Sequence, residues 1–259
     1  MTRLRSAGCV FAEDEAALLV AEAGTPAELV AMVDRRAAGW PLEQVVGWAE
    51  FCGVRIAVDP GVFVPRVRTE CLVRKATELA HHGVRPGSQP LVVVDLCCGS
   101  GAVGVALGAA LGDVELHSSD IDPAAVRCAR RNVLNMGGQV YEGDLVEPLP
   151  PRLLGRVDLL VANVPYVPTD EIGLLPAEAR LHEPTVALDG GPDGLVIARR
   201  VIDEAPRWLA TGGHLVFETS AHQAAHAVDA VAGCGLDPRV VRCEELDATV
   251  VIGVMCWAG

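Results

Sequence analysis

The chain has 259 residues, of which 51% are apolar, 21% are charged and only 4% are aromatic. A chain of this length and composition can bury a sizeable core, so a disordered protein is not expected. The net charge of −13 is uneven, because residues 1–90 have a balance of −1 and residues 91–259 a balance of −12. Because the segment 91–259 is strongly acidic, it repels phosphate backbones, and direct binding of nucleic acid is not expected.

Hydropathy and cysteine content bear on the cellular compartment. No run of 18 apolar residues occurs, and charges are spread through the first 15 residues, so we expect neither a membrane span nor a signal peptide. The nine cysteines are odd in number and form no Cys-x-x-Cys pair, which indicates neither a disulfide framework nor a metal site. We therefore expect a cytoplasmic protein with reduced thiols.

The first 90 residues predict helices followed by a β-hairpin. Residues 12–23 are rich in Ala and Glu, and Thr25-Pro26-Ala27-Glu28 has the form of a capping box, which predicts a helix that stops near Gly39. Further expected elements are a turn at 42–46, a hairpin at 51–58, a helix at 69–82 and a linker at 85–90. We expect residues 1–48 to form a small N-terminal helical region and residues 49–90 a hairpin with a linking helix.

From residue 91 onward, strands and helices alternate. Leu91–Leu96 is a continuous apolar run, which is typical of a parallel strand covered on both faces. Further strands are expected at 114–119, 139–142, 157–162, 214–218, 238–243 and 249–257, and helices from 102 and at 123–135, 193–209 and 221–232. The last two strands are close in sequence and must pair antiparallel. Residues 91–259 are thus predicted to form an α/β, Rossmann-like sheet, mostly parallel, with an antiparallel C-terminal hairpin.

A glycine-rich segment leads from the strand at 91–96 into the next helix. Gly99, Gly101 and Gly104 satisfy the spacing GxGxxG, in which residues without Cβ allow a tight turn and a close approach of a ligand to the main chain. Asp120 ends the following strand, where a carboxylate could accept hydrogen bonds from ribose hydroxyls. These features suit S-adenosylmethionine and a nicotinamide dinucleotide equally well, and a tight turn without a ligand is a third interpretation.

A second motif, Asn163-Val164-Pro165-Tyr166, follows the strand at 157–162. Ligands of open α/β sheets lie outside the carboxyl ends of the strands, so we expect this turn beside the glycine loop. The Asn163 side-chain oxygen and the Val164 carbonyl could hold a substrate NH2 group in line with a sulfonium methyl group. Pro165 fixes its own φ, and Tyr166 offers a flat face to a planar amide or base. The alternative is an ordinary turn that closes a strand.

Taken together, the sequence resembles the protein-(glutamine-N5) methyltransferases, the HemK/PrmC family, over about residues 25–259. Besides the two motifs, the resemblance is carried by Arg35-Arg36, Pro41-Leu42, Gly47, the segment 59–66, Thr69-Glu70, His182-Glu183-Pro184, the segment 190–195 and Gly212-Gly213. It implies a class I methyltransferase fold and an enzyme that uses S-adenosylmethionine to methylate a protein glutamine. In the family, this glutamine belongs to the Gly-Gly-Gln loop of peptide-chain release factors.

The resemblance also assigns roles to individual residues. The methionine part of the cofactor would be lined by Cys97, Cys98, Gly99, Ser100 and Gly101. Asp120 would hold the ribose, and Asp144 and Leu145 would flank the adenine. Asn163, Val164, Pro165 and Tyr166 would grip the substrate amide, with Asn163 bordering the cofactor as well.

The chain departs from the family pattern at several places. Val164 stands where the family has Pro, Leu145 where it often has an aromatic residue, and Val67-Arg68 interrupts its Pro-Arg-Pro-Glu/Asp-Thr-Glu pattern. The N-terminal helical region has about half the usual length. Arg66 and Glu70 could shape the substrate entrance or form a surface ion pair. Two other functions stay open: an amino-methyltransferase of an RNA or DNA base, and a non-catalytic nucleotide-binding module.

Overall fold

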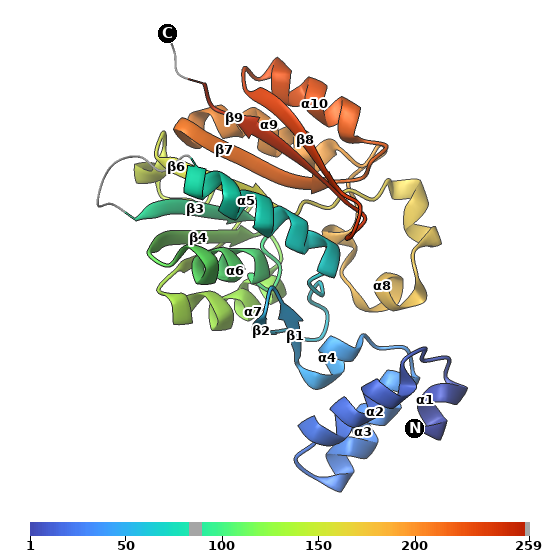
Figure 1. Ribbon diagram of the computed structural model, residues 1–259. Helices are drawn as coiled ribbons and strands as arrows, with labels where there is room; N and C mark the ends of the chain where they lie inside the picture. Colours follow the sequence, from blue (N-terminus) through green and yellow to red (C-terminus); the bar gives the residue numbers. More distant parts are fainter. Residues whose placement is uncertain (83–89, 257–259) are drawn as a thin grey trace.

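A seven-stranded sheet lies at the centre of the α/β body (Figure 1). The computed structural model describes residues 1–82 and 90–256. The strands are β3 (Leu91–Leu96), β4 (Val114–Asp120), β5 (Gln139–Glu142), β6 (Val157–Ala162), β7 (Leu209–Thr219), β8 (Asp237–Cys243) and β9 (Ala248–Val254). Their order is β5-β4-β3-β6-β7-β9-β8; the pairs from β5 to β7 are parallel, and β9 is antiparallel to both of its neighbours. The predicted fold class is confirmed.

Helices cover both faces of this sheet. The helices are α5 (Glu70–His82), α6 (Ala102–Leu111) and α7 (Pro123–Val133) on one face and α9 (Val196–Trp208) and α10 (Ala224–Gly233) on the other. Side chains of β3 alternate between the two layers, since Val93 packs with α5 and α6 whereas Val92 and Val94 pack with α9. A strand buried on both faces needs apolar residues at nearly every position, which explains the continuous run.

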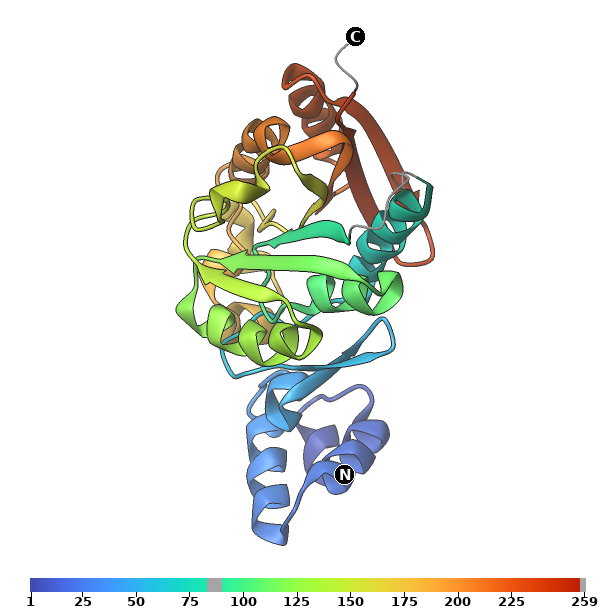
Figure 2. The same cartoon turned by 90° about the vertical axis from the view of Figure 1, so that its left-hand side faces the viewer.

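The N-terminal helical region projects from this body (Figure 2). It contains α1 (Thr2–Ser6), α2 (Ala12–Glu22), α3 (Pro26–Ala37) and α4 (Leu42–Val46), followed by the hairpin of β1 (Trp48–Phe51) and β2 (Val54–Ala57). The first bond of the predicted capping box is present, because Thr25 Oγ1 accepts from the Glu28 amide at 3.1 Å; the Glu28 carboxylate accepts in turn from the amide of Gly24, one residue before the N-cap, at 2.9 Å. A small apolar core of its own, centred on Leu4, Leu19 and Met32, holds the helices together.

Some element boundaries differ from the prediction. The hairpin begins at Trp48 because Gly47 ends α4 in the left-handed conformation, after which the chain is extended. Helix α9 begins at Val196, since the Asp193 carboxylate accepts the Leu195 amide in a preceding turn. Strand β7 runs through the Gly-Gly pair at 212–213, which forms an irregularity in the strand and does not end it. Helix α1, helix α8 (Ala177–His182) and the short 3-10 helices were not predicted. Most of the expected linker, residues 85–89, and residue 257 lie outside the described residues.

Arg36 ties the N-terminal helical region to a segment far along the chain. Its guanidinium contacts the Glu15 carboxylate at 2.8 Å and the Glu178 carboxylate of α8 at 3.2 Å. The Gln44 side-chain amide donates to the carbonyls of Val62 and His182. These contacts place the helical region against residues 177–182, which lead into the wall of the cavity described below.

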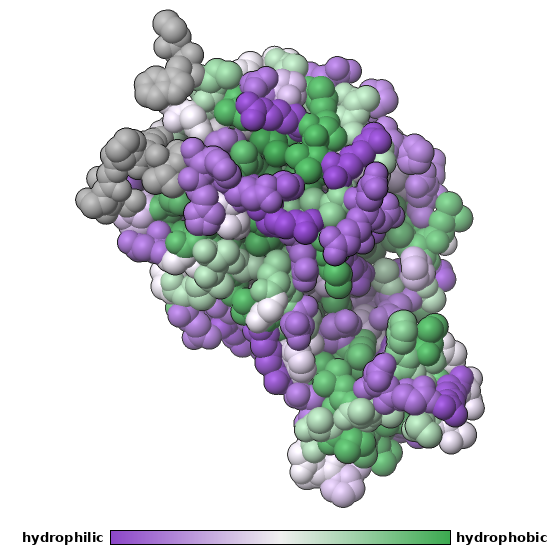
Figure 3. Space-filling model, viewed as in Figure 1, coloured by the Kyte–Doolittle hydropathy of each residue, from purple (hydrophilic) through white to green (hydrophobic). Residues whose placement is uncertain are grey.

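The surface of the N-terminal helical region is partly apolar. Figure 3 shows apolar side chains gathered over these helices on one face of the molecule. Exposed apolar residues of the region include Val10, Phe11, Val20 and Val30. In the described part of the chain, no helix combines the length and the apolarity that a membrane crossing requires.

The Arg36 contacts lead to a stability prediction. Replacing Arg36 with Ala should lower the unfolding free energy by about 3 kcal/mol at pH 7, because the Glu15 carboxylate would stay buried without its partner. The hydrogen bond from Arg36 lowers the pKa of Glu15, so the difference between wild type and variant should shrink as the pH falls through that lowered pKa. Urea unfolding measures both. Arg3→Ala, which removes an exposed pair with Asp34, is the control and should cost less than about 1 kcal/mol; equal losses in the two variants would contradict the prediction.

Candidate active site

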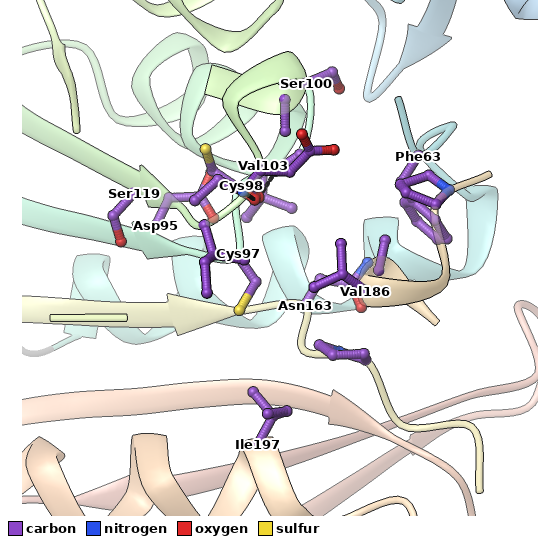
Figure 4. A pocket seen from close by; sticks show the side chains of 18 of the residues that line it. Phe63, Asp95, Cys97, Cys98, Ser100, Val103, Ser119, Asn163, Val186 and Ile197 are labelled. Atoms are coloured by element: carbon purple, nitrogen blue, oxygen red, sulfur yellow. Dashed lines mark hydrogen bonds between the residues drawn. The ribbon is translucent and has the colours of Figure 1, made fainter. Parts of the chain in front are cut away.

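One cavity of about 320 Å³ opens at the carboxyl ends of β3, β4 and β6. Figure 4 shows Asn163 just past the end of its strand, with Cys97 on the side of the glycine loop and Phe63 and Val186 on the opposite side. Of the residues predicted for the site, those that line the cavity are Cys97, Cys98, Gly99, Ser100, Asp120, Asp144, Leu145, Asn163 and Pro165. Gly101, Val164 and Tyr166 lie next to these residues in the chain and are not part of the lining.

The glycine loop is shaped by backbone conformation. Cys97, Gly99 and Gly101 all have φ between 53° and 79°, and Gly101 is the N-cap of α6. The Gly99 amide donates to the Asp120 carboxylate at 2.8 Å, which joins the loop to the end of β4. Gly104 has a different task, because a Cβ there would lie 3.0 Å from the Asp95 carboxylate. The third glycine of the motif therefore serves the packing of α6 against the sheet.

The charge of the cavity selects among the cofactors that the motif allows. Its acidic lining residues are Asp95, Asp120, Asp122, Asp144 and Asp189. Arg200 is the single basic residue among the described lining residues, and it is already paired with Asp144 at 2.7 Å. Such a lining suits a cation with hydroxyl groups, as S-adenosylmethionine is, and disfavours the diphosphate of a nicotinamide dinucleotide.

Apolar residues that the sequence reasoning missed complete the cofactor side. Ile121 is 53% exposed directly after Asp120 and lines the cavity, and Ile197 reaches it from α9. Leu145 has φ of 49°, and its carbonyl accepts a hydrogen bond from Ser119 Oγ, so the backbone there is fixed in an uncommon conformation. Ile121 could have been found from its place beside Asp120, whereas nothing in the sequence indicated Ile197 or Arg200.

Asn163 is held with its nitrogen toward the protein. Its Nδ2 donates to Oγ1 of Thr69 at 3.4 Å, and Thr69 is buried at the start of α5. This contact leaves Oδ1 for another donor. The Val164 side chain is buried in the core, and in the described part of the chain no group donates to its carbonyl oxygen.

The Tyr166 side chain is not part of the cavity lining, and its hydroxyl lies at the end of β7. Its hydroxyl donates to Glu218 at 2.9 Å, and burial, followed by the Glu218 charge, raises the pKa of Tyr166. The Gln223 side-chain amide donates to the Tyr166 carbonyl at 2.9 Å and to the Asp193 carbonyl at 3.0 Å. A Cβ on Gly194 would lie 2.3 Å from the Tyr166 oxygen, so only glycine fits at this close approach.

Glu183 fixes the wall opposite the glycine loop. Its fully buried carboxylate accepts from the Val64 amide at 3.1 Å and pairs with Arg66 at 2.6 Å. The alternative of a surface ion pair between Arg66 and Glu70 is therefore wrong. Glu70 lies at the start of α5 and accepts instead from the Cys52 amide in the hairpin turn. Glu183 thereby joins the cavity residues Phe63 and Pro65 to Pro184 and Val186.

The cysteines of the site are poor nucleophiles. Burial raises the pKa of the Cys97 thiol, and the charges of Asp120 and Asp95 raise it further. Burial also raises the pKa of Cys98 well above its ordinary value. Both side chains are thus neutral near pH 7, so the site is built for holding a ligand and not for covalent attack by sulfur.

Asp95 gives the site a pH dependence. Burial raises its pKa to about 7, against the hydrogen bond from Gly104 that lowers it. The folded state then holds a proton that the unfolded chain releases near pH 4, so the contribution of Asp95 to stability is largest at low pH and falls as the pH rises toward 7. Relative to Asp95→Asn, the wild type should lose about 1.5 kcal/mol of unfolding free energy between pH 5.5 and pH 7. Urea unfolding across this range tests the prediction, and parallel pH profiles for the two proteins would refute it.

Comparison with known proteins identifies relatives over most of this chain. Residues 55–174 match the family described as Methyltransferase small domain. A release factor glutamine methyltransferase from Geobacter sulfurreducens is 39% identical over 204 residues, which are 77% of this chain and 68% of that protein. A 4-amino-L-phenylalanine/4-methylamino-L-phenylalanine methyltransferase from Streptomyces pristinaespiralis is 39% identical over 195 residues, 74% of this chain and 65% of that protein.

The fold has solved counterparts as well. The crystal structure of the ribosomal protein L11 methylase from Lactobacillus delbrueckii subsp. bulgaricus superposes with a TM-score of 0.53, at 19% identity, over 78% of this chain and 86% of that one. This likeness concerns the fold, and it agrees with the predicted class I methyltransferase sheet. From the sequence relatives and the geometry of the cavity together, we conclude that the chain belongs to the release factor glutamine methyltransferase family.

Proposed function

We propose that this chain transfers a methyl group from S-adenosylmethionine to the side-chain amide nitrogen of a glutamine in a peptide-chain release factor or a related protein. The observation that carries the proposal is the position of Asn163. It lines the same cavity as the glycine loop, its Nδ2 lies 3.4 Å from Thr69 Oγ1, and in the described part of the chain no protein group donates to Oδ1, which could accept from a substrate NH2 group. The relatives named for this activity support the choice of acceptor.

The cavity fits the methyl donor. S-adenosylmethionine supplies an electrophilic methyl group on a sulfonium sulfur. We assign the ribose hydroxyls to Asp120, whose carboxylate projects from the end of β4. The adenine would lie among the apolar side chains of Ile121, Leu145 and Ile197, beside Asp144. Cys97, Cys98, Gly99 and Ser100 would border the methionine part, with Gly101 holding the loop from behind.

The acceptor amide needs alignment more than activation. An amide nitrogen is a weak nucleophile because its lone pair is delocalised into the carbonyl, so its two hydrogens must be held in a fixed direction. Asn163 Oδ1 and the Val164 carbonyl are two acceptors on consecutive residues that could hold them. Both oxygens would stabilise the positive charge that develops on the nitrogen during methyl transfer, and the released proton can pass to water. In this arrangement Pro165 forms the wall and Tyr166 supports the turn through Glu218.

A second acceptor deserves a test because one relative favours it. The Streptomyces pristinaespiralis protein is as identical to this chain as the Geobacter sulfurreducens protein, and it is named for the methylation of an amino group on an aromatic ring. An aniline nitrogen is planar and carries two hydrogens, so the same pair of acceptors could hold it. The acidic body and the absence of a basic cluster in the described cavity lining speak against the third candidate, an RNA or DNA base.

The cofactor assignment predicts a selective loss of affinity. Asp120→Asn should raise the Kd for S-adenosylmethionine by about tenfold or more, because one charged acceptor of a hydroxyl hydrogen bond is lost. Isothermal calorimetry measures the change, and Asp113→Asn, an exposed residue before β4, is the matched control. Wild-type protein should show no measurable affinity for NAD. Binding of NAD as tight as that of S-adenosylmethionine would instead favour a nucleotide-binding module.

The acceptor assignment predicts a loss of turnover with binding retained. Asn163→Ala should lower the rate of methyl transfer to a purified release factor by about 100- to 1000-fold, in line with other preorganised hydrogen-bonding groups. The Kd for S-adenosylmethionine should change far less. Label from S-adenosyl-[methyl-³H]methionine reports the transfer, and a release factor with Gly-Gly-Glu in place of Gly-Gly-Gln is the acceptor control. Full activity of Asn163→Ala, or no label in any release factor with the wild type, would refute the proposal.

A further inference from the structure

Two arginines flank the acceptor side of the cavity, and each is held by a buried glutamate. Arg66 Nη2 lies 2.6 Å from Glu183, and Arg68 Nε lies 3.2 Å from Glu218. The two glutamate side chains are 0% and 2% exposed, whereas Arg66 and Arg68 are 33% and 48% exposed. Each guanidinium is therefore fixed on its inner edge and open to solvent on another.

Both guanidinium groups lie against aromatic rings next to the acceptor turn. Arg66 is 4.9 Å from the ring centroid of Phe63, which lines the cavity. Arg68 is 5.7 Å from the ring centroid of Tyr166, the residue that follows Pro165. The charges of both arginines lower the pKa of Tyr166 against the effects of burial and Glu218, so both are within electrostatic reach of one phenol.

Unused hydrogen-bond donors remain on both side chains. In the described part of the chain, Arg68 Nε forms an ion pair with Glu218 Oε1 at 3.2 Å, and its two terminal nitrogens donate to no protein group. Glu218 Oε1 also accepts from Tyr166, while Oε2 is buried without any partner in the described residues. A buried carboxylate with so few donors holds its arginine firmly, because losing that contact would leave the charge uncompensated. The free edges are thus preorganised to meet an anion.

We propose that Arg66 and Arg68 recognise a carboxylate of the acceptor molecule that lies near the nitrogen to be methylated. This inference rests on the proposed function, since it concerns the acceptor of the same site. The carboxylate belongs either to an acidic residue beside a protein glutamine or to the free carboxyl group of an aromatic amino acid.

The local charge balance favours a carboxylate over a nucleic-acid phosphate backbone. Glu183 and Glu218 neutralise Arg66 and Arg68, so the cluster offers directed hydrogen bonds without an excess of positive charge. Binding of a polyanion relies on clustered excess cations, and residues 91–259 carry a balance of −12. A single carboxylate can be held by the outer edges of two guanidinium groups without that excess.

The test compares acceptors that differ only in this carboxylate. One pair is acetyl-Gly-Gly-Gln-Asp-amide and acetyl-Gly-Gly-Gln-Asn-amide; the other is 4-amino-L-phenylalanine and its carboxamide. Binding to the full-length protein with S-adenosylhomocysteine present is measured by calorimetry, which requires no turnover. The charged member of at least one pair should bind about tenfold more tightly or better. Which pair discriminates shows whether the carboxylate belongs to a protein or to an amino acid.

Variants then assign the preference to the arginine. Arg68→Gln should reduce the preference to less than about twofold, the size expected once the charge-assisted contact is gone. Because this variant leaves Glu218 buried and unpaired, the double variant Arg68→Gln/Glu218→Gln, which removes both charges, should show the same loss in a stably folded protein. Arg239→Gln, on the exposed strand β8, changes the net charge equally and should keep the full preference.

Three results would overturn the inference. The first is equal or unmeasurable binding for the two members of both pairs. The second is a preference for the charged member that persists in both Arg68 variants. The third is tighter binding of a single-stranded oligothymidylate than of any charged acceptor. Methyl transfer measured on the same samples separates this inference from the proposed function. A carboxylate preference without methylation of any release factor would refute the proposed function alone. Methylation of a release factor without a carboxylate preference would refute only the proposal that Arg66 and Arg68 recognise a carboxylate.

Discussion

The register of three parallel strands is the constraint on which the site depends. Leu96 of β3 lies opposite Ser119 of β4 on one side and opposite Ala162 of β6 on the other. Because the three strands end at the same level, the glycine loop, Asp120 and Asn163 leave the sheet together at one edge. A slip of one strand would turn its side chains to the other face and break both apolar layers, so packing in the core protects the geometry of the site.

Around this edge, the protein uses buried carboxylates in two different ways. Asp95 and Asp120 are bound by backbone amides of the glycine loop and its helix, so they shape the loop and make the cavity acidic. Glu183 and Glu218 are bound to arginines and lie on the acceptor side. The side proposed to bind the cationic methyl donor is thus acidic, whereas the two arginine–glutamate pairs beside the proposed acceptor side are balanced in charge. This division agrees with a transfer reaction in which one reactant carries a positive charge and the other is an amide or amine.

Much of the fold and of the candidate site could be predicted from the sequence, and the parts that could not be predicted were missed for physical reasons. The buried strands gave continuous apolar runs, and motifs at their ends marked the residues of one sheet edge, so the positions of Asp120 and Asn163 were foreseeable. The segment 169–187 was not, since its short helices lack apolar periodicity and are held by distant partners such as Arg36. The placement of Arg66 was missed for the same reason: its partner Glu183 is 117 residues away. The stacking role predicted for Tyr166 stays a prediction; the Tyr166 hydroxyl donates to Glu218.

The corner built by Gly194, Gln223 and Tyr166 has a consequence for divergence among related enzymes. The Gln223 side-chain amide donates to the carbonyls of Tyr166 and Asp193, and so links the turn after β6 to the segment before α9. The space at Gly194 between these groups has no room for a Cβ. A side chain at Gly194 would collide with the Tyr166 carbonyl and the Gln223 amide, so a substitution there would displace the turn that carries Tyr166. We therefore expect a change of acceptor to require substitutions in other parts of the chain, such as the segment 177–187, the residues around Arg68, and the N-terminal helices that contact residues 178 and 182.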